Sequence, residues 1–365
     1  MDNKLWAEEM WQKCQKKITK TAERIGGMIP YTTKDGKYNE VADIDWWTNS
    51  FWAGILWHMF AETQDERFKK WAQEVEDTLN KNFEDSEKLH HDVGFMWLLS
   101  SVRNYELTGN KKSRSYGFVA ANMLAGRYNI KGGYIRAWNQ WGEDDNTGWA
   151  IIDCMMNIPL LYWASDIVKD DRFKYIAMSH ADKVIENFIR PDGSVNHIVE
   201  FNPENGEFVR SFGGQGYKEG SSWSRGQAWA INGFAQSYHA TGEDRYLDAA
   251  KRVANYFISA CAEDLVPRCD FRQPLDAVAY DSSAAACAAC GLIDIARATE
   301  GAESEMYMNA AIRFLKALDE RCCPWDDEND EAILNYGMER FNSGHIALIY
   351  GDYYFLDAIL KIKNM

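Results

Sequence analysis

Two aspartates in apolar segments have the residue type and setting that acid–base chemistry requires. Asp153 lies within residues 148–165, GWAIIDCMMNIPLLYWAS, which we predict to be one strongly apolar helix. An ionised carboxylate in such a segment is costly unless it is paired or hydrogen-bonded. Asn157 lies one helical turn later on the same face and could supply that partner. A structural role and a catalytic role for Asp153 are therefore both open.

Asp92 begins a second apolar segment, KLHHDVGFMWLLSSV, where an aspartate commonly caps a helix N-terminus. If both carboxylates face one cavity, their mutual repulsion and the apolar walls raise one of the two pKa values. We expect the more apolar Asp153 to hold the proton, and the helix N-terminus to favour the charge of Asp92. Such a pair can carry out general acid–base catalysis.

The elements that must position these aspartates are predicted to be helices almost throughout the chain. Five polar turns each join two apolar helical segments, and a further helix at 350–362 can pair with the N-terminal helix; the turns lie at 63–72, 108–120, 168–181, 241–254 and 299–311. Six such hairpins predict an all-α fold, an (α/α)6 barrel, in a single domain over residues 1–365. An open helical solenoid is the alternative.

In a closed barrel, the loops that precede the inner helices gather at one end and form the mouth of a cavity. The longest irregular stretch, residues 190–222, is rich in glycine and asparagine and contains His197 and Gln215. Long loops in compact domains are usually functional or disordered, and these side chains favour a functional loop.

Composition excludes several classes of partner. The chain has 365 residues, 46% of them hydrophobic, and a formal net charge of −15, which disfavours binding to nucleic acid or to an anionic membrane. Its 15 tryptophans and 18 tyrosines are a weak indication of sugar binding, since aromatic faces pack against sugar rings. The N-terminus lacks the pattern of a secretory signal, and no stretch is long and apolar enough to span a membrane. We therefore expect a cytoplasmic protein.

The eight cysteines are scattered through the chain, so we expect free thiols and no disulfide framework. Cys287 and Cys290 have a spacing found in metal sites, but they stand alone in an alanine-rich helical segment. We predict that they belong to a helix core and bind no zinc.

Seven motifs, in order along the chain, resemble the unsaturated glucuronyl hydrolases of glycoside hydrolase family 88: HHDVGF, IIDCMMNIPLL, AWNQWG, FNPENG, WSRGQAWA, DSSAAA and GDYYFL. This resemblance implies an (α/α)6 barrel and an enzyme without metal or cofactor. Its substrates would be small oligosaccharides that a lyase has left with a C4=C5 double bond in the terminal uronate. The family hydrates that vinyl ether, and the resulting hemiketal rearranges and releases the next sugar.

The resemblance also implies roles for individual residues. It makes Asp153 the proton donor and water activator, and Asp92 its partner carboxylate. It makes seven further residues substrate contacts: Trp47, His91, Trp138, His197, Gln215, Arg225 and Trp229. A guanidinium can hold a carboxylate at two points, so we expect Arg225 to clamp the uronate. Relatives that favour sulfated sugars have a lysine shortly before GDYY, which this chain lacks, so we predict no such preference.

Three other functions remain open from the sequence. An unsaturated rhamnogalacturonyl hydrolase of family 105 would share the barrel and the chemistry, although HHD and WSRGQAW fit family 88 better. A sugar epimerase on the same barrel would be expected to use paired histidines at inner-helix starts. A noncatalytic sugar-binding toroid would keep the aromatic residues without needing both aspartates. The sequence does not distinguish a monomer from a homodimer.

Overall fold

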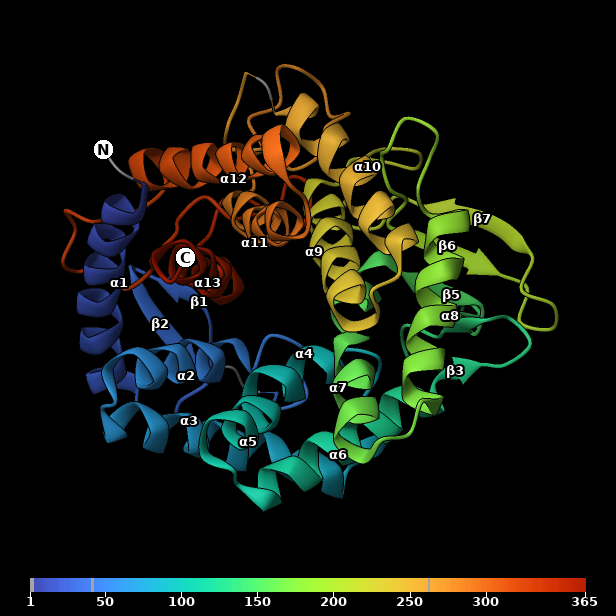
Figure 1. Cartoon of the computed structure of the whole chain (residues 1–365), viewed down its shortest axis with the longest axis horizontal. Helices are drawn as coiled ribbons and strands as arrows, with labels where there is room; N and C mark the ends of the chain where they lie inside the picture. Colours follow the sequence, from blue (N-terminus) through green and yellow to red (C-terminus); the bar gives the residue numbers. More distant parts are fainter. Residues whose placement is uncertain (1–2, 41–42, 262) are drawn as a thin grey trace.

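The computed structural model describes residues 3–40, 43–261 and 263–365, and its helices form two concentric rings (Figure 1). Each inner helix is followed or preceded by an outer partner. The pairs are α2 (Phe51–Thr63) with α3 (Glu66–Leu79); α4 (Val93–Trp97), the π-helical turn η3 (Leu98–Val102) and α5 (Arg103–Thr108) with α6 (Lys111–Gly126); α7 (Pro159–Val168) with α8 (Arg172–Asn187); α9 (Ser224–Thr241) with α10 (Asp244–Ala260); α11 (Ser282–Ala298) with α12 (Gly301–Arg321); and α13 (Ile349–Lys363) with α1 (Asn3–Ile25).

The inner ring is closed, because α13 packs against both α11 and α2. The last helix of the chain also packs against the first, so α1 and α13 complete the sixth pair (Figure 1). The predicted (α/α)6 barrel and the hairpin turns are confirmed, and the open solenoid is excluded.

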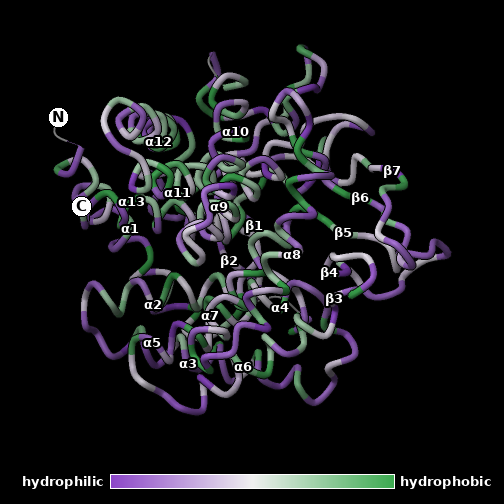
Figure 2. Tube along the Cα trace, turned by 45° about the vertical axis from the view of Figure 1, so that its right-hand side comes forward, coloured by the Kyte–Doolittle hydropathy of each residue, from purple (hydrophilic) through white to green (hydrophobic). Residues whose placement is uncertain are grey.

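Local sequence explains why the hairpins turn where they do. Asp65 caps α3 by accepting a hydrogen bond from the backbone N–H of Arg67 at 2.9 Å, and Asn110 caps α6 in the same way. Gly109 and Gly242 end α5 and α9 in the left-handed conformation that glycine adopts without strain. Hydrophobic residues concentrate along the inner helices, and hydrophilic residues dominate the peripheral loops (Figure 2).

Among the described residues, three small antiparallel sheets accompany the ring of helices. They consist of β1 (Pro30–Lys34) with β2 (Lys37–Glu40); β3 (Tyr128–Asn129) with β4 (Tyr134–Ile135); and the order β5 (Trp149–Ile151), β6 (Ile198–Phe201), β7 (Phe208–Phe212). Short 3₁₀ turns, η1 (Asn80–Glu84) and η2 (Ser86–Lys88), lead toward α4.

The prediction of one helix over residues 148–165 is wrong. This stretch forms strand β5, then the 3₁₀ turn η4 (Ile152–Met156), and only then helix α7. The reason is a tertiary contact: β5 pairs with β6, with Ala150 opposite Val199, and β6 lies in the stretch predicted to be an irregular loop. A continuous apolar run does not by itself distinguish a buried strand from a buried helix.

All eight cysteines are free thiols, as expected. Cys287 and Cys290 are fully buried within α11, which confirms that they belong to a helix core. Among the described residues, no helix has the length and apolar character needed to cross a membrane.

A close backbone approach joins α4 to the turn η4. A Cβ atom placed on Gly94 would lie 2.3 Å from the Cα of Asn157, a distance that real Cβ contacts do not reach. Glycine at this position therefore lets the segment that carries Asp92 lie directly against the segment that carries Asp153.

We expect Gly94→Ala to lower the free energy of unfolding by about 1–3 kcal/mol, because the added methyl group must push the two segments apart. The matched control is Gly126→Ala at the end of α6, where an added Cβ meets no atom within 4 Å. The control should be neutral or slightly stabilising. Urea unfolding of both variants would measure the difference, and equal stabilities would contradict the close-approach argument.

Candidate active site

A cavity of about 470 Å³ lies at the end of the barrel where several inner helices begin. Both aspartates line it, Asp92 just before α4 and Asp153 in η4. Six tryptophans contribute to its walls: Trp46, Trp47, Trp138, Trp141, Trp149 and Trp223. The cavity thus combines two carboxylates with broad aromatic surfaces, which is an arrangement suited to a sugar ring.

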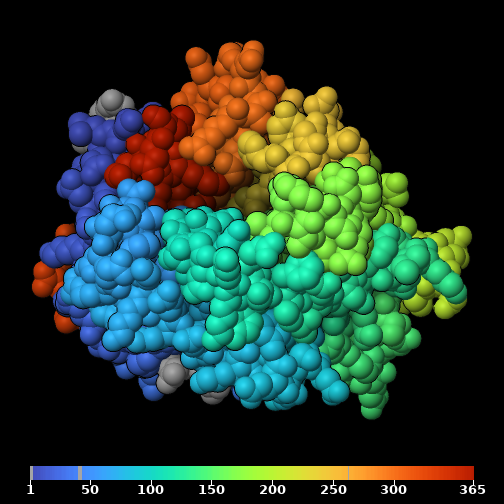
Figure 3. Space-filling view, turned by 60° about the horizontal axis from the view of Figure 1, so that its bottom comes forward, coloured from blue at the N-terminus to red at the C-terminus, as the bar shows by residue number. Residues whose placement is uncertain are grey.

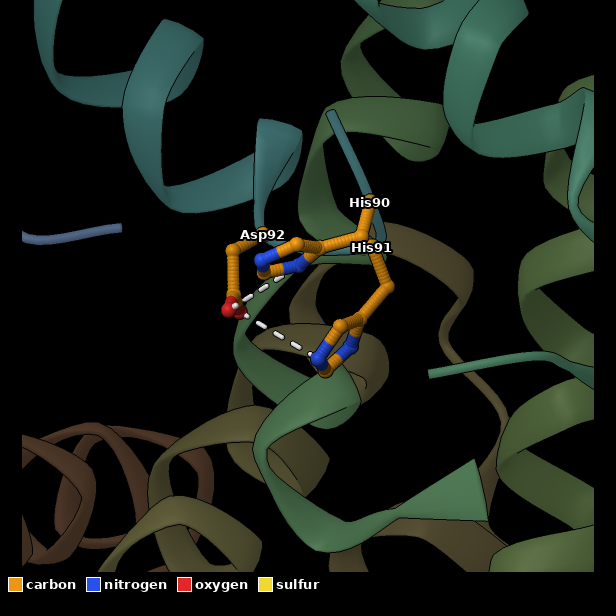
Figure 4. A group of neighbouring side chains, drawn as sticks. All are labelled: His90, His91 and Asp92. Carbon is orange, nitrogen blue, oxygen red and sulfur yellow. Dashed lines mark ion pairs between the residues drawn. The ribbon is translucent and has the colours of Figure 1, made fainter. Parts of the chain in front are cut away.

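Asp92 occupies the N-cap position of α4, but its side chain makes no capping hydrogen bond. Its Oδ1 instead accepts a hydrogen bond from the side-chain amide of Asn157 at 2.9 Å. His90 and His91 each place one ring nitrogen 3.5 Å from this carboxylate (Figure 4). The simple helix-cap explanation for Asp92 therefore does not apply.

Asn157 connects the two catalytic candidates. Besides its bond to Asp92, its Nδ2 donates to the backbone carbonyl of Asp153 at 3.3 Å, and its Oδ1 accepts from the backbone N–H of Phe95 at 2.7 Å. The sequence analysis singled out Asn157 as a possible partner of the Asp153 carboxylate. The structure shows that it binds the carboxylate of Asp92.

The raised pKa belongs to Asp92. Burial, followed by repulsion from the charge of Asp153, raises the pKa of Asp92 to about 7, while the hydrogen bond from Asn157 opposes the shift. The expectation that the helix N-terminus would favour the charge of Asp92 is wrong, because the carboxylate is buried and makes no capping hydrogen bond to α4 among the described residues. Burial also lowers the pKa of His90 to about 4 and that of His91 well below its usual value, so both imidazoles are neutral at pH 7.

Asp153 faces His197 across the cavity wall, with 3.5 Å between Asp153 Oδ2 and His197 Nε2. His197 Nδ1 accepts a hydrogen bond from the backbone N–H of Gln215 at 3.0 Å, so in neutral histidine the proton lies on Nε2 and points toward Asp153. Trp223 packs against the imidazole at a centroid distance of 4.4 Å. His197 is thus held in one orientation toward the carboxylate.

Arg225 and Gln215 line the cavity and are anchored to the same loop. The Gln215 amide and one terminal nitrogen of Arg225 both donate to the carbonyl of Glu339, each at 2.7 Å. The other terminal nitrogen of Arg225 bonds the carbonyl of Met338 and forms a buried ion pair with Asp281. This anchoring fixes residues 338–339 beside the cavity.

The expected two-point clamp on the uronate stays a prediction, and both terminal nitrogens of Arg225 already have protein partners. Its Nε is buried and has no hydrogen-bond partner. The side chain is 1% exposed, so its ion pair with Asp281 is buried. Arg225 can offer a ligand its Nε–H and its positive charge.

The structure brings seven of the nine predicted residues to the cavity: Asp92, Asp153, Trp47, Trp138, His197, Gln215 and Arg225. The other two are fully buried and lie behind its lining. Trp229 packs edge-on against Trp47 and Phe95, at centroid distances of 6.5 and 5.4 Å. His91 lies behind Asp92. These two residues support the cavity wall.

Several lining residues escaped the sequence analysis, namely His90, Trp141, Trp149, Phe212, Trp223 and Arg340. One signal could have found part of this set. Trp149, Ile151 and Asp153 alternate along the chain and all line the cavity, as residues at i, i+2 and i+4 do when a strand leads into a site. The helix prediction for this stretch concealed the alternation.

Comparison with known proteins agrees with this geometry. Residues 21–354 match glycosyl hydrolase family 88. The chain belongs to this family. It is therefore a glycoside hydrolase, and the match covers nearly all of the barrel. The conclusion favours an enzyme over a noncatalytic toroid or a sugar epimerase.

Individual relatives are similar over nearly their whole length. The chain is 34% identical to an unsaturated glucuronyl hydrolase of Bacillus sp. (strain GL1), over 94% of this chain and 93% of the relative. It is 31% identical to an unsaturated chondroitin disaccharide hydrolase of Streptococcus agalactiae serotype III (strain NEM316), over 98% and 92%. A solved structure described as UGL with dGlcA-Glc-Rha-Glc superposes with a TM-score of 0.92 at 32% identity, covering 98% of this chain and 96% of the other.

The pKa of Asp92 makes a prediction for stability. Its folded-state pKa of about 7 lies above the unfolded value, so the folded protein binds the extra proton at low pH. The free energy of unfolding should fall as pH rises from about 5 to 7, by up to about 1.4 kcal/mol per pH unit from this group. Asp92→Asn removes this term, so the variant should gain stability relative to the wild type as pH rises.

Thermal unfolding at pH 5, 6, 7 and 8 would measure this difference. Asp276→Asn, at an exposed aspartate, is the matched control and should follow the wild type at every pH. A stability difference between Asp92→Asn and wild type that stays constant with pH would contradict the raised pKa.

Proposed function

We propose that this family 88 enzyme removes the 4,5-unsaturated uronic acid from the non-reducing end of lyase-generated oligosaccharides, with glycosaminoglycan-type disaccharides as its substrate class. The observation that carries the proposal is the coupled pair Asp92 and Asp153, joined through Asn157 on the wall of an aromatic cavity. The relatives are named unsaturated glucuronyl hydrolase and unsaturated chondroitin disaccharide hydrolase, and these names support the same substrate class here.

In the proposed reaction, the carboxylate pair holds one proton at neutral pH. Asp92, the group with the raised pKa, holds this proton in the free enzyme and passes it to Asp153. Asp153 delivers it to C4 of the unsaturated uronate, and positive charge develops at C5 and the ring oxygen. Asp92 and Asp153, now both ionised, stabilise that charge. Asp153 then takes a proton from a water molecule whose oxygen bonds to C5, so the pair regains its proton. The hemiketal opens, and the bond to the next sugar breaks.

The residues around the two aspartates fit these steps. His197 Nε2 lies 3.5 Å from Asp153 Oδ2, and the hydrogen bond from Gln215 to its other nitrogen fixes the ring beside the carboxylate. Arg225 adds positive charge on the same cavity wall, where the uronate carboxylate can be held. The tryptophan walls present apolar surface around the reacting groups, which strengthens these electrostatic interactions.

We predict that the enzyme has no preference for a sulfated leaving sugar. The loop before GDYY carries Arg340 at the cavity, and no lysine occurs between it and that motif. We also propose a cytoplasmic location, since eight unpaired cysteines are typical of proteins from a reducing compartment.

The test is the ultraviolet absorbance of the conjugated C4=C5 carboxylate, followed with unsaturated chondroitin and hyaluronan disaccharides. The wild-type enzyme should bleach it, and Asp153→Asn should lower kcat by about 10²–10⁴-fold, because the amide can neither donate the proton nor activate water. Asp166→Asn, at an exposed aspartate on α7, is the matched control and should retain wild-type kcat.

Two results would contradict the proposal. Faster bleaching of an unsaturated rhamnogalacturonan disaccharide would transfer the activity to the substrate class of family 105. If no substrate were bleached while sugar affinity survived in Asp153→Asn, the chain would be a binding protein.

A further inference from the structure

His90, His91 and Asp92 form a cluster of potential metal ligands at the turn before α4. Both imidazole rings turn toward the Asp92 carboxylate (Figure 4). His90 Nδ1 lies 3.5 Å from Asp92 Oδ2, and His91 Nε2 lies 3.5 Å from Asp92 Oδ1. One donor atom from each of the three residues falls within 4.8 Å of the others.

These separations suit a small tetrahedral cation. With zinc bonds of about 2.0–2.1 Å to nitrogen and oxygen, neighbouring ligand atoms of a tetrahedron lie about 3.4 Å apart. The two histidine–carboxylate distances of 3.5 Å are close to that edge length. Two imidazole nitrogens and a carboxylate form a donor set that zinc prefers, whereas magnesium and calcium prefer oxygen ligands.

The histidine nitrogens also lack other partners. His90 Nδ1 and both ring nitrogens of His91 are buried and make no hydrogen bond to any residue that the structure describes, and the side chain of His91 is fully buried. A buried polar atom without a partner costs about 1–3 kcal/mol, so native proteins keep few of them without a reason. A bound cation would satisfy one nitrogen on each ring.

The cluster opens to the cavity, because His90 and Asp92 are both lining residues. We propose that His90, His91 and Asp92 bind a zinc-type divalent cation and that its occupancy inhibits the enzyme. Three protein ligands leave a fourth position for water or for an anionic group of a ligand in the cavity. Coordination commits the Asp92 carboxylate to the cation, and the bound cation occupies the cavity wall beside Asp153. The metal is thus an inhibitor and has no role as a cofactor.

The first experiment measures binding directly and does not depend on the proposed activity. Calorimetric titration of the chelator-treated full-length protein with Zn²⁺ at pH 7 should show one site with a Kd of about 10 µM or tighter. His90→Gln should weaken it by at least about tenfold, since it removes one of three ligands. The matched control is His239→Gln, at an exposed histidine near the end of α9, which should bind like the wild type.

Co²⁺ in place of Zn²⁺ reports which residues bind, because thiolate ligands add a charge-transfer band that histidine and carboxylate ligands lack. We expect the visible bands of a nitrogen–oxygen site without the thiolate band, and their loss in His90→Gln. Thermal unfolding of the metal-free variants would show that they remain folded. His91→Gln, at a fully buried position, provides a second test only if it passes this control.

The outcomes separate clearly. Absence of saturable binding below 100 µM, on the scale of about 5 kcal/mol of binding free energy, would overturn the site. A thiolate band, or equal affinity in His90→Gln, would place the metal elsewhere and also overturn it.

Inhibition is then measured with the disaccharide assay: Zn²⁺ should abolish bleaching at the concentration that fills the site, and EDTA should restore it. If Zn²⁺ fills the site and bleaching continues, the inhibitory role is overturned while the site and the proposed hydrolase activity both stand.

Discussion

The side-chain amide of Asn157 is the contact on which the site depends. Its one donor nitrogen reaches both the Asp92 carboxylate and the backbone of Asp153, and its oxygen holds the first turn of α4 through Phe95. Two segments that are 61 residues apart, 153 − 92 = 61, thereby keep a fixed separation. Gly94 makes this possible, because any larger side chain would strike the Asn157 backbone. Proton sharing between two carboxylates requires such a fixed separation, since their mutual repulsion falls off with distance.

Burial of these charges in turn requires the closed ring. The carboxylates lie at one end of the barrel, above a layer in which Phe95, Trp229 and Tyr354 pack together at centroid distances of 5.4 and 5.5 Å. A second cavity, of about 290 Å³, touches Phe95 and Tyr354 and is lined by residues of α2, α5, α9 and α13, so this layer separates it from the active site. The space-filling view shows a hollow at the centre of the ring, bordered by the red C-terminal segment and by teal, green and gold segments (Figure 3). Burial of Asp92 at this end of the closed ring is the largest cause of its raised pKa.

The opposite wall is held by a buried charge network. Arg225, at the start of α9, pairs with Asp281, the cap of α11, and both bind the loop that precedes α13. The Asp281 carboxylate also accepts from the backbone N–H and hydroxyl of Ser283. A buried ion pair of this kind contributes geometry more reliably than stability. The network fixes the start of α9, the start of α11 and the loop before α13 relative to one another at the mouth of the cavity.

The sequence by itself determined the hairpins, because each turn is encoded by adjacent capping residues such as Asp65 and Asn110 and by glycine at the helix ends. It also identified Asp92, Asp153 and Asn157, since polar residues in apolar segments are conspicuous without any structure. Only the tertiary structure decided their relations. Residues 149–151 became a strand because β6 lies beside them, and Asp92 became the group with the raised pKa because burial outweighs the effect of the helix N-terminus. Strand pairing and desolvation both depend on residues distant in the chain, so neither could be predicted from local sequence.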